Sequence, residues 1–203
     1  MIHHAPDVGR ICYAIGVEIS IEPAARTIAT SVRRAQLSDI TVLAELINRA
    51  YAVEASFIDG QRTSAAELAT LIPAGGFLVL EYAGGIAASV RFLAPGQQRD
   101  VPPGNAYFGM LSVLPELQGL GLGRRLVQVA EAMAEATGAT AMSLRVINLR
   151  EELTRWYKSL GYREVGTSPY NHRATIRPCH FIEMAKPLAP VSAHYAGRAI
   201  GAA

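Results

Sequence analysis

The sequence predicts one mixed α/β domain, and two observations lead to this expectation. Predicted strands and helices follow one another in the order β-α-α-β-β-β-α-β-α-β-β. No linker long enough to separate two domains interrupts this order. With 203 residues, 50% of them hydrophobic, the chain can bury a substantial core. We therefore expect a domain over residues 28–187, a poorly defined extension over 1–27 and a tail over 188–203.

The first half of this domain contains two helices between strands. Val42, Leu43, Leu46, Ile47 and Ala50 share one face at helical spacing, which predicts an amphipathic helix. In order we expect a strand over residues 28–34, a helix from Ser38 or Asp39 to Tyr51, a shorter helix capped by Thr63 or Ser64, and strands over 77–82 and 86–93 joined through Gly84-Gly85.

The central stretch, residues 107–138, predicts a strand, a glycine-rich loop and a helix. The short apolar run over 108–113 is typical of a strand, and Pro115 ends it. Helical spacing begins at Leu122, and Gly138 stands where a left-handed C-terminal cap belongs. A helix start presents unpaired N–H groups and partial positive charge. Glycines before it allow phosphates to approach the backbone, so this loop is a candidate phosphate site.

The spacing in this loop excludes two common nucleotide motifs. A P-loop requires Gly-Lys-Ser/Thr, but Arg124 and Arg125 follow Gly123. A dinucleotide fingerprint beginning at Gly119 would require glycine at position 124 and an acidic residue about 20 residues later. Residues 138–145 contain no acid. A glycine-rich turn before a packed helix remains the structural alternative.

The second half predicts a strand over 141–146, a helix, and two closing strands over 162–166 and 180–185. Asn148 is expected to cap this helix, with Glu151 reaching back, and Gly161 to end it. The apolar face of the helix is expected to comprise Leu149, Leu153, Trp156, Tyr157 and Leu160.

Composition limits the possible partners and compartments. The charged fraction is 18% and the net charge only +2, so we expect no nucleic-acid partner. Cys12 and Cys179 are too few for a disulfide framework or a metal site, and we expect no metal. No apolar stretch approaches the ~20 residues of a membrane helix. We expect a cytoplasmic protein with no membrane partner, as a monomer or homodimer.

Two motifs resemble the GCN5-related N-acetyltransferase (GNAT) superfamily. One is Gln118-x-x-Gly121-x-Gly123, entered from a strand ending in Val113-x-Pro115. The other is Val146-Ile147-Asn148 followed by the sequence WYKSLGY over residues 156–162. Together they cover roughly residues 106–166. The resemblance implies the GNAT fold, a central mixed, mostly antiparallel sheet of six to seven strands flanked by four helices.

The resemblance also implies a reaction and a set of residues for it. The enzyme would transfer the acetyl group of acetyl-CoA directly to a primary amine of a small molecule or protein. Tyr157 would be the general acid, although on periodicity alone it is a core residue. Asn148 would contact the CoA arm, act as a helix cap, or both. The remaining contacts to acetyl-CoA would come from Leu111, Ser112 and Val113 for pantetheine, and from Gln118, Gly119, Leu120, Gly121, Leu122, Gly123 and Arg124 for pyrophosphate.

The sequence does not identify a general base. Residues 106–113 and 141–146, where many relatives carry a carboxylate, contain no Asp or Glu. Two possibilities therefore remain. A base could act through a water molecule, or the substrate amine could lose its proton with little help from the enzyme. Possible sources of a base are Glu54, Glu81 and His172, each of which is also compatible with plain surface charge, and His180 reads as a packed strand residue.

The acceptor surface is expected in the loops over residues 51–64, 95–105 and 167–179, where Arg62 could bind an acceptor carboxylate. Two alternatives to acetyl transfer remain at this point. One is transfer from another acyl-CoA donor, and the other is a non-catalytic module that binds acyl-CoA.

Overall fold

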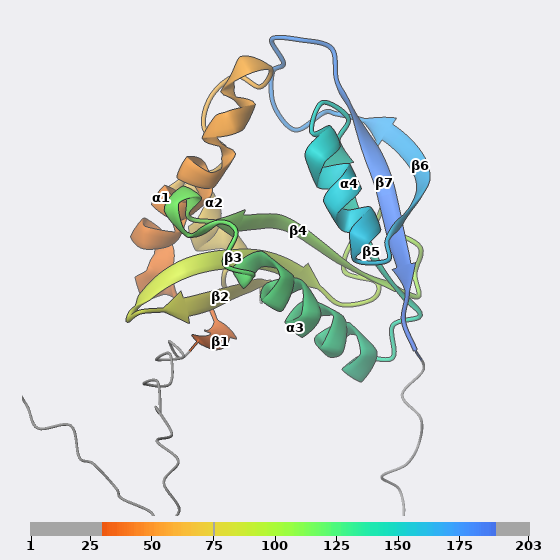
Figure 1. Ribbon diagram of the computed structural model, residues 1–203, viewed down its shortest axis with the longest axis horizontal. Helices are drawn as coiled ribbons and strands as arrows, with labels where there is room; N and C mark the ends of the chain where they lie inside the picture. Colours follow the sequence, from red (N-terminus) through yellow and green to blue (C-terminus); the bar gives the residue numbers. More distant parts are fainter. Residues whose placement is uncertain (1–29, 75, 190–203) are drawn as a thin grey trace, which may run out of the picture.

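A computed structural model describes residues 30–74 and 76–189 (Figure 1). The expected extension over 1–27 and residues 190–203 of the expected tail lie outside the described residues. The elements follow the predicted order: β1 (Thr30–Arg34), α1 (Ile40–Tyr51), α2 (Ala65–Leu71), β2 (Phe77–Tyr82), β3 (Gly85–Leu93), β4 (Asn105–Val113), α3 (Leu122–Ala136), β5 (Ala141–Ile147), α4 (Glu151–Ser159), β6 (Arg163–Pro169) and β7 (His180–Pro187), with short 3-10 helices η1 (Leu37–Asp39), η2 (Ala52–Ser56) and η3 (Pro115–Leu117).

The strands form one seven-stranded sheet in the order β1-β2-β3-β4-β5-β7-β6. Neighbouring strands are antiparallel except β4 and β5, which are parallel. The predicted mixed, mostly antiparallel sheet with four α-helices is therefore confirmed.

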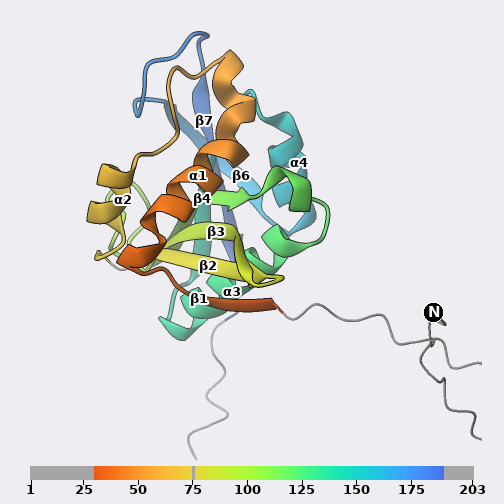
Figure 2. The same cartoon turned by 90° about the vertical axis from the view of Figure 1, so that its left-hand side faces the viewer.

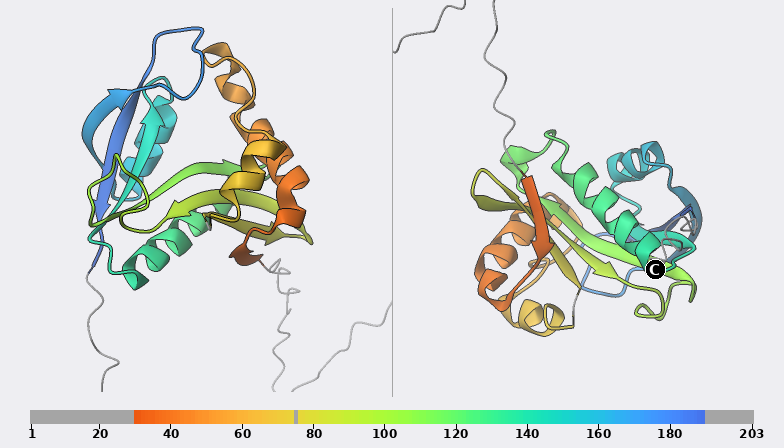
Figure 3. Two further views of the ribbon diagram at one scale, coloured as in Figure 1. Left: turned by 180° about the vertical axis from the view of Figure 1, so that it is seen from behind. Right: turned by 90° about the horizontal axis from the view of Figure 1, so that it is seen from below.

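Helices cover both faces of the sheet. Helices α1 and α2 lie on one face of the β1–β4 half, and α3 lies on the opposite face (Figure 2; Figure 3, right). On the α1 side, Leu43 and Leu46 pack with Val79 in one buried cluster. On the α3 side, Leu126 and Phe108 belong to a larger cluster that also includes residues of α4. Burial of these apolar faces is the main force that holds the layers together.

Strands β4 and β5 pair only at their beginnings. Residues Asn105 to Tyr107 lie opposite Ala141 to Ser143, and beyond them the two halves of the sheet diverge (Figure 1; Figure 3, left). Strand β4 also contains a bulge against β3, because Met110 and Leu111 occupy the space opposite one β3 residue. Met110 has a φ of 50°, a left-handed value that is rare for residues other than glycine. A bulge bends and twists its strand, which contributes to the opening of the sheet here.

Helix α4 ends in a Schellman motif, which explains the final letters of WYKSLGY. Gly161 has a φ of 95°, and its N–H donates to Lys158 O at 3.0 Å. The N–H of Tyr162 donates to Tyr157 O at 3.1 Å, and the two tyrosine rings contact each other with centroids 5.8 Å apart. The glycine therefore turns the chain so that Tyr162 returns to the face of the helix that carries Tyr157. Gly138, with a φ of 75°, ends α3 as predicted.

Several predicted details of the elements are wrong. Helix α4 begins at Glu151 with Arg150 as its N-cap residue, so Asn148 does not cap it. Instead, the Asn148 side-chain oxygen accepts a hydrogen bond from the His180 N–H at 2.9 Å, a contact across the sheet that no local pattern reveals. Val42 is 50% exposed although its spacing placed it on the apolar face of α1. Strands β6 and β7 also extend further than predicted, because they pair with each other over most of their length.

Candidate active site

A cavity of about 590 Å³ lies where β4 and β5 diverge. Its walls come from five separate parts of the chain. These are the end of α1 with the following loop (Tyr51, Glu54, Arg62), strand β4 (residues 107–111 and 113), the loop into α3 (Leu117 to Gly119 and Gly121 to Arg124), the segment from β5 into α4 (Leu144 to Ile147, Arg150, Glu152, Leu153, Trp156, Tyr157), and the stretch after β6 with the start of β7 (Tyr170, His172, Phe181).

One end of the cavity, here called the loop end, is formed by residues 117–124. Gly119 and Gly121 have φ values of 84° and 80°, and Gly121 is the N-cap residue of α3. A Cβ at either glycine would meet nothing within 4 Å. These glycines are therefore required by the backbone conformation, and the space around them remains open to another molecule.

The backbone at the loop end suits an anionic ligand. The first α-helical hydrogen bond of α3 runs from the Arg125 N–H to Gly121 O at 3.0 Å. The N–H groups of Leu122 to Arg124 precede that bond, and the helix dipole adds partial positive charge there. Arg124 lines the cavity and supplies a full positive charge. The residues present thus fit a phosphate-bearing group such as the pyrophosphate of CoA.

Close packing holds this loop against β4. A Cβ on Gly123 would lie 3.4 Å from Val113 Cγ2, so the helix approaches the strand closely at this glycine. The side-chain amide of Gln118 donates to Val113 O at 3.2 Å and ties the loop to the end of the strand. The loop and the diverging edge of β4 therefore form one continuous wall.

Tyr157, the predicted general acid, lines this cavity. So do most of the residues predicted to bind acetyl-CoA: Leu111, Val113, Gln118, Gly119, Gly121, Leu122, Gly123 and Arg124. Three do not. Ser112 is 1% exposed, and its hydroxyl donates to Met110 O at 3.1 Å. Leu120 is 55% exposed on the outside of the loop. Asn148 has its side-chain oxygen bonded to the β7 backbone.

Tyr157 is both a core residue and a cavity residue. It is 6% exposed and packs against Phe108, Trp156 and Tyr162, with ring centroids 4.8 to 5.9 Å apart. No hydrogen bond to its hydroxyl is found among the described residues, although the residue lines the cavity. Burial raises the pKa of Tyr157 well above its usual value, so the hydroxyl keeps its proton at neutral pH.

A buried ion pair lies in the same cavity. Glu54, in η2 directly after α1, is 7% exposed, and its Oε1 accepts a hydrogen bond from Arg150 Nη1 at 3.0 Å. Arg150 also pairs with Glu152. Burial raises the pKa of Glu54, and the positive charge of Arg150 opposes that rise. The sequence left open whether Glu54 is a base or a surface charge. Its burial excludes the second of these.

The other candidate bases differ in position. Glu81 lies on β2 and accepts hydrogen bonds from Ser31 and Arg33, away from the cavity lining. His172 lines the cavity from the loop between β6 and β7. His180 begins β7 and is exposed, so the prediction of a packed strand histidine is wrong.

Tyr107 stands where β4 and β5 begin to separate. Its ring extends along the strand, because a Cβ on Gly109 would lie 3.0 Å from the Tyr107 hydroxyl oxygen. Because Gly109 has no side chain, the Tyr107 ring can lie directly against it. Arg145, on the neighbouring strand, is held by Glu183 at 3.2 Å and by Asp100 O at 2.9 Å.

Sequence patterns gave no signal that Tyr107, Arg145 or Arg150 would line a cavity. Each becomes a cavity residue only because distant segments of the chain pair with one another.

A backbone connection that we call the arch (residues 57–59 with 174–176) joins the segment after α1 to the loop between β6 and β7. We call the part of the cavity that these two segments line, through Tyr51, Glu54, Arg62, Tyr170 and His172, its arch side. The Asp59 N–H donates to Ala174 O at 3.0 Å, and the Ile176 N–H donates to Phe57 O at 2.9 Å. Ile58 and Thr175 form an isolated antiparallel bridge. Figure 1 shows the loop between β6 and β7 meeting the segment after α1 above the gap between the sheet halves.

Residues 30–74 and 76–189 contain no group of three or more His, Cys, Asp or Glu side chains placed to hold a metal ion. Within the same residues, no helix is long and apolar enough to cross a membrane.

Several solved structures share this fold at low sequence identity. The ribosomal-protein-S18-alanine N-acetyltransferase of Escherichia coli is 20% identical with a TM-score of 0.64, and the match covers 82% of this chain and 98% of that chain. A protein of Salmonella typhimurium, assigned as an acetyltransferase and solved with its cofactor acetyl-CoA, is 22% identical with a TM-score of 0.63, covering 83% and 99%. A GCN5-related N-acetyltransferase from Kribbella flavida is 22% identical with a TM-score of 0.62, covering 79% and 98%.

No curated protein matches the sequence significantly. The family model described as "Acetyltransferase (GNAT) family" matches residues 40–162, which is more than half of the chain. This match spans the loop end of the cavity, the ion pair of Glu54 with Arg150, and Tyr157. The chain therefore belongs to the GNAT family of N-acetyltransferases.

Proposed function

We propose that this protein transfers the acetyl group of acetyl-CoA to a primary amine within a ternary complex. One observation carries the proposal: a single cavity joins a glycine-rich loop at a helix start, a diverging strand edge, a buried tyrosine and a buried carboxylate. The first two features suit the donor, and the last two suit proton transfer during attack by an amine.

The loop end and β4 have the positioning role. The amides of residues 118–124 and the Arg124 guanidinium hold the pyrophosphate. The backbone of Leu111 to Val113 runs along the opening of the sheet and aligns the pantetheine arm. Bound in this way, acetyl-CoA supplies a thioester carbon that accepts the electron pair of the amine. Fixing both reactants in one cavity removes much of the entropic barrier.

Two side chains carry out the proton transfers of the reaction. An incoming amine is protonated in water and must lose a proton before it can attack. Glu54 has a free Oε2 among the described contacts, and its raised pKa makes it a stronger base than an exposed carboxylate. Tyr157, which remains protonated, donates its hydroxyl proton to the departing CoA sulfur. We assign Glu54 as general base and Tyr157 as general acid.

The test is release of the CoA thiol from acetyl-CoA in the presence of a panel of small amines and amine-bearing peptides. We expect amine-dependent thiol release and an N-acetylated product detected by mass spectrometry. The same assay with propionyl-CoA and longer donors measures acyl-chain preference. Thermal stabilisation by CoA with no turnover of any amine would contradict the proposal and support a non-catalytic acyl-CoA-binding module.

A further inference from the structure

Arg62 differs from the other arginines on the same side of the cavity. Arg145 is paired with Glu183, and Arg150 with Glu54. Arg62 also lines the cavity, yet its guanidinium forms no ion pair with any described residue. It is half-buried, and its Cζ lies 5.1 Å above the centre of the Tyr51 ring. An aromatic face stabilises a guanidinium without using all of its hydrogen-bond donors. One donor is within reach of the Tyr51 hydroxyl, whose pKa it lowers against the larger effect of burial, and the remaining donors are available to a ligand.

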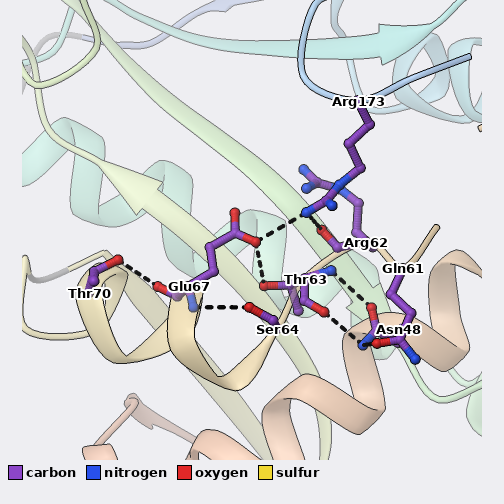
Figure 4. Close-up of polar contacts among 8 residues, drawn as sticks. All are labelled: Asn48, Gln61, Arg62, Thr63, Ser64, Glu67, Thr70 and Arg173. Carbon is purple, nitrogen blue, oxygen red and sulfur yellow. Dashed lines mark hydrogen bonds and ion pairs between the residues drawn. The ribbon is translucent and has the colours of Figure 1, made fainter. Parts of the chain in front are cut away.

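The backbone that carries Arg62 is fixed on both sides. Arg173, from the loop between β6 and β7, donates to Arg62 O at 2.8 Å and pairs with Glu67 at 3.2 Å. On the other side, the Thr63 N–H donates to Asn48 Oδ1 at 2.9 Å, and Asn48 Nδ2 donates to Thr63 O at 3.0 Å. Figure 4 shows these contacts converging on residues 62 and 63 from α1, α2 and the distant loop. The side chain thus projects from a rigid support, which reduces the entropy lost when it binds a ligand.

The surroundings of Arg62 belong to the arch side of the cavity. Its charge lowers the pKa of Tyr170 and Tyr107 against the larger effect of burial, which raises both. Loss of hydration, followed by the charge of Arg62, lowers the pKa of His172. The groups that experience its field also include Tyr51, Glu54 and Arg91, so they come from α1, η2, β3, β4 and the loop between β6 and β7. The pyrophosphate loop is formed by residues 117–124.

We propose that Arg62 binds the carboxylate of the acceptor, so that the acceptor is a small amine with a carboxylate, such as an amino acid. The inference rests on the proposed acetyltransferase function and adds the substrate class. A guanidinium with free donors binds a carboxylate by two parallel hydrogen bonds. Arg62 would hold the carboxylate, while Glu54, eight residues earlier in the chain, faces the amine. Opposite charges on acceptor and site then fix which end of the molecule faces the thioester.

The experiment compares amino acids with their carboxamides, which keep the amine and the shape but lose the negative charge. Thiol release is measured for α-amino acids, β-alanine and γ-aminobutyrate, each beside its amide. Because amidation also changes the basicity of the amine, the readout is the acid-to-amide ratio of kcat/KM in the wild type relative to each variant. We expect Arg62→Gln to lower this ratio about 10- to 100-fold, the usual range for loss of a hydrogen-bonded charge partner.

Two variants serve as controls. Arg62→Lys keeps the charge but not the two-pronged geometry, so its ratio should fall between wild type and Arg62→Gln. Arg163→Gln removes an exposed arginine of β6 that does not line the cavity, and its ratio should equal that of the wild type. The KM for acetyl-CoA should be unchanged in all three.

The outcomes separate the two proposals. Turnover of plain amines and amides but not of amino acids overturns the carboxylate assignment and leaves the acetyltransferase intact. A raised KM for acetyl-CoA in Arg62→Gln also overturns it, since Arg62 would then serve the donor. If no amine is turned over, the proposed function fails, and calorimetric titration of N-acetylalanine and its amide into the CoA-loaded protein still tests the anion site. Equal binding of acid and amide there would overturn it.

Discussion

At its loop end the cavity is lined by three glycines and the start of helix α3, whereas on the arch side it is lined mainly by charged and aromatic residues. The loop end consists of consecutive residues, 117–124, whose glycines and helix start provide N–H groups. The arch side combines Tyr51, Glu54, Arg62 and Tyr107 with residues around 145–150 and 170–172.

This difference matches what each end has to bind. A donor with the same phosphates throughout a family can be held by backbone, which any sequence supplies if its glycines allow the conformation. Acceptors differ between enzymes, and discrimination among them requires particular side chains. Substitutions at the loop end should therefore change donor affinity, and substitutions on the arch side should change acceptor use.

The largest effect is expected at Tyr157, where the two ends meet. Tyr157→Phe should lower kcat by about 1,000-fold, within the range for general acids. CoA affinity and stability should hardly change, because the hydroxyl has no hydrogen bond among the described residues. Steady-state kinetics and calorimetry with CoA measure the two quantities. Unchanged kcat would make Tyr157 a packing residue only.

Glu54→Gln should lower kcat/KM by about 100-fold at neutral pH, because the base is lost. In the wild type, activity should rise with pH through the Glu54 pKa, which burial places above its usual value. The variant should lack that rise.

The raised pKa of Glu54 in the folded state means that its ionisation lowers the free energy of unfolding. This loss of stability is present above that pKa and absent at low pH. Urea unfolding should therefore find the variant at least as stable as wild type at neutral pH. A wild-type pH profile in the variant would exclude Glu54 as base.

A φ of 80° costs a non-glycine residue about 1–2 kcal/mol, so Gly121→Ala should disturb the loop conformation proposed to bind CoA. We expect this variant to bind CoA about tenfold more weakly, with little change in the KM for the acceptor. Gly84→Ala is the matched control: Gly84 has a φ of 84°, and a Cβ there also meets open space. It lies in the β2–β3 turn and should lose similar stability without any change in CoA affinity. Equal CoA affinities for the two variants would argue against a phosphate site at the loop end.

The smallest effect on activity is expected for Tyr162→Phe, the counterpart of Tyr157→Phe in the same aromatic cluster. The Tyr162 hydroxyl donates to Glu131 Oε1 at 2.7 Å and does not line the cavity. Its removal should cost about 1 kcal/mol of stability and leave kcat unchanged. Chemical denaturation and steady-state kinetics test this pair of outcomes. A large loss of kcat here would show that the cluster, rather than the Tyr157 proton, governs activity.

The parts of the molecule that the sequence predicted well are those determined by neighbouring residues. The order of helices and strands along the chain, the glycine conformations at Gly138 and Gly161, and the helix that starts after Gly121 all follow from local spacing. The sheet's divergence does not, because it depends on the limited pairing of β4 with β5 and on a bulge at Met110.

The arch side could not be predicted for the same physical reason. Asn148 was expected to cap the nearest helix, but the structure gives its side chain a partner 32 residues away. Glu54 carries no sequence signal of burial, since its ion-pair partner Arg150 lies 96 residues away in the chain. Arg62 could be nominated as a carboxylate ligand by residue type alone. Its suitability depends on Asn48 and Arg173, which only the fold brings together.

The arch also changes how the sheet behaves mechanically. Two half-sheets joined only at the pairing of residues 105–107 with 141–143 would form a hinge, free to widen at the far side. The backbone bonds between residues 57–59 and 174–176 add a second attachment there. The structure becomes a closed frame, in which neither half can swing without breaking hydrogen bonds at one of the two attachments. Backbone hydrogen bonds at both attachments thereby restrict the distance between the two half-sheets.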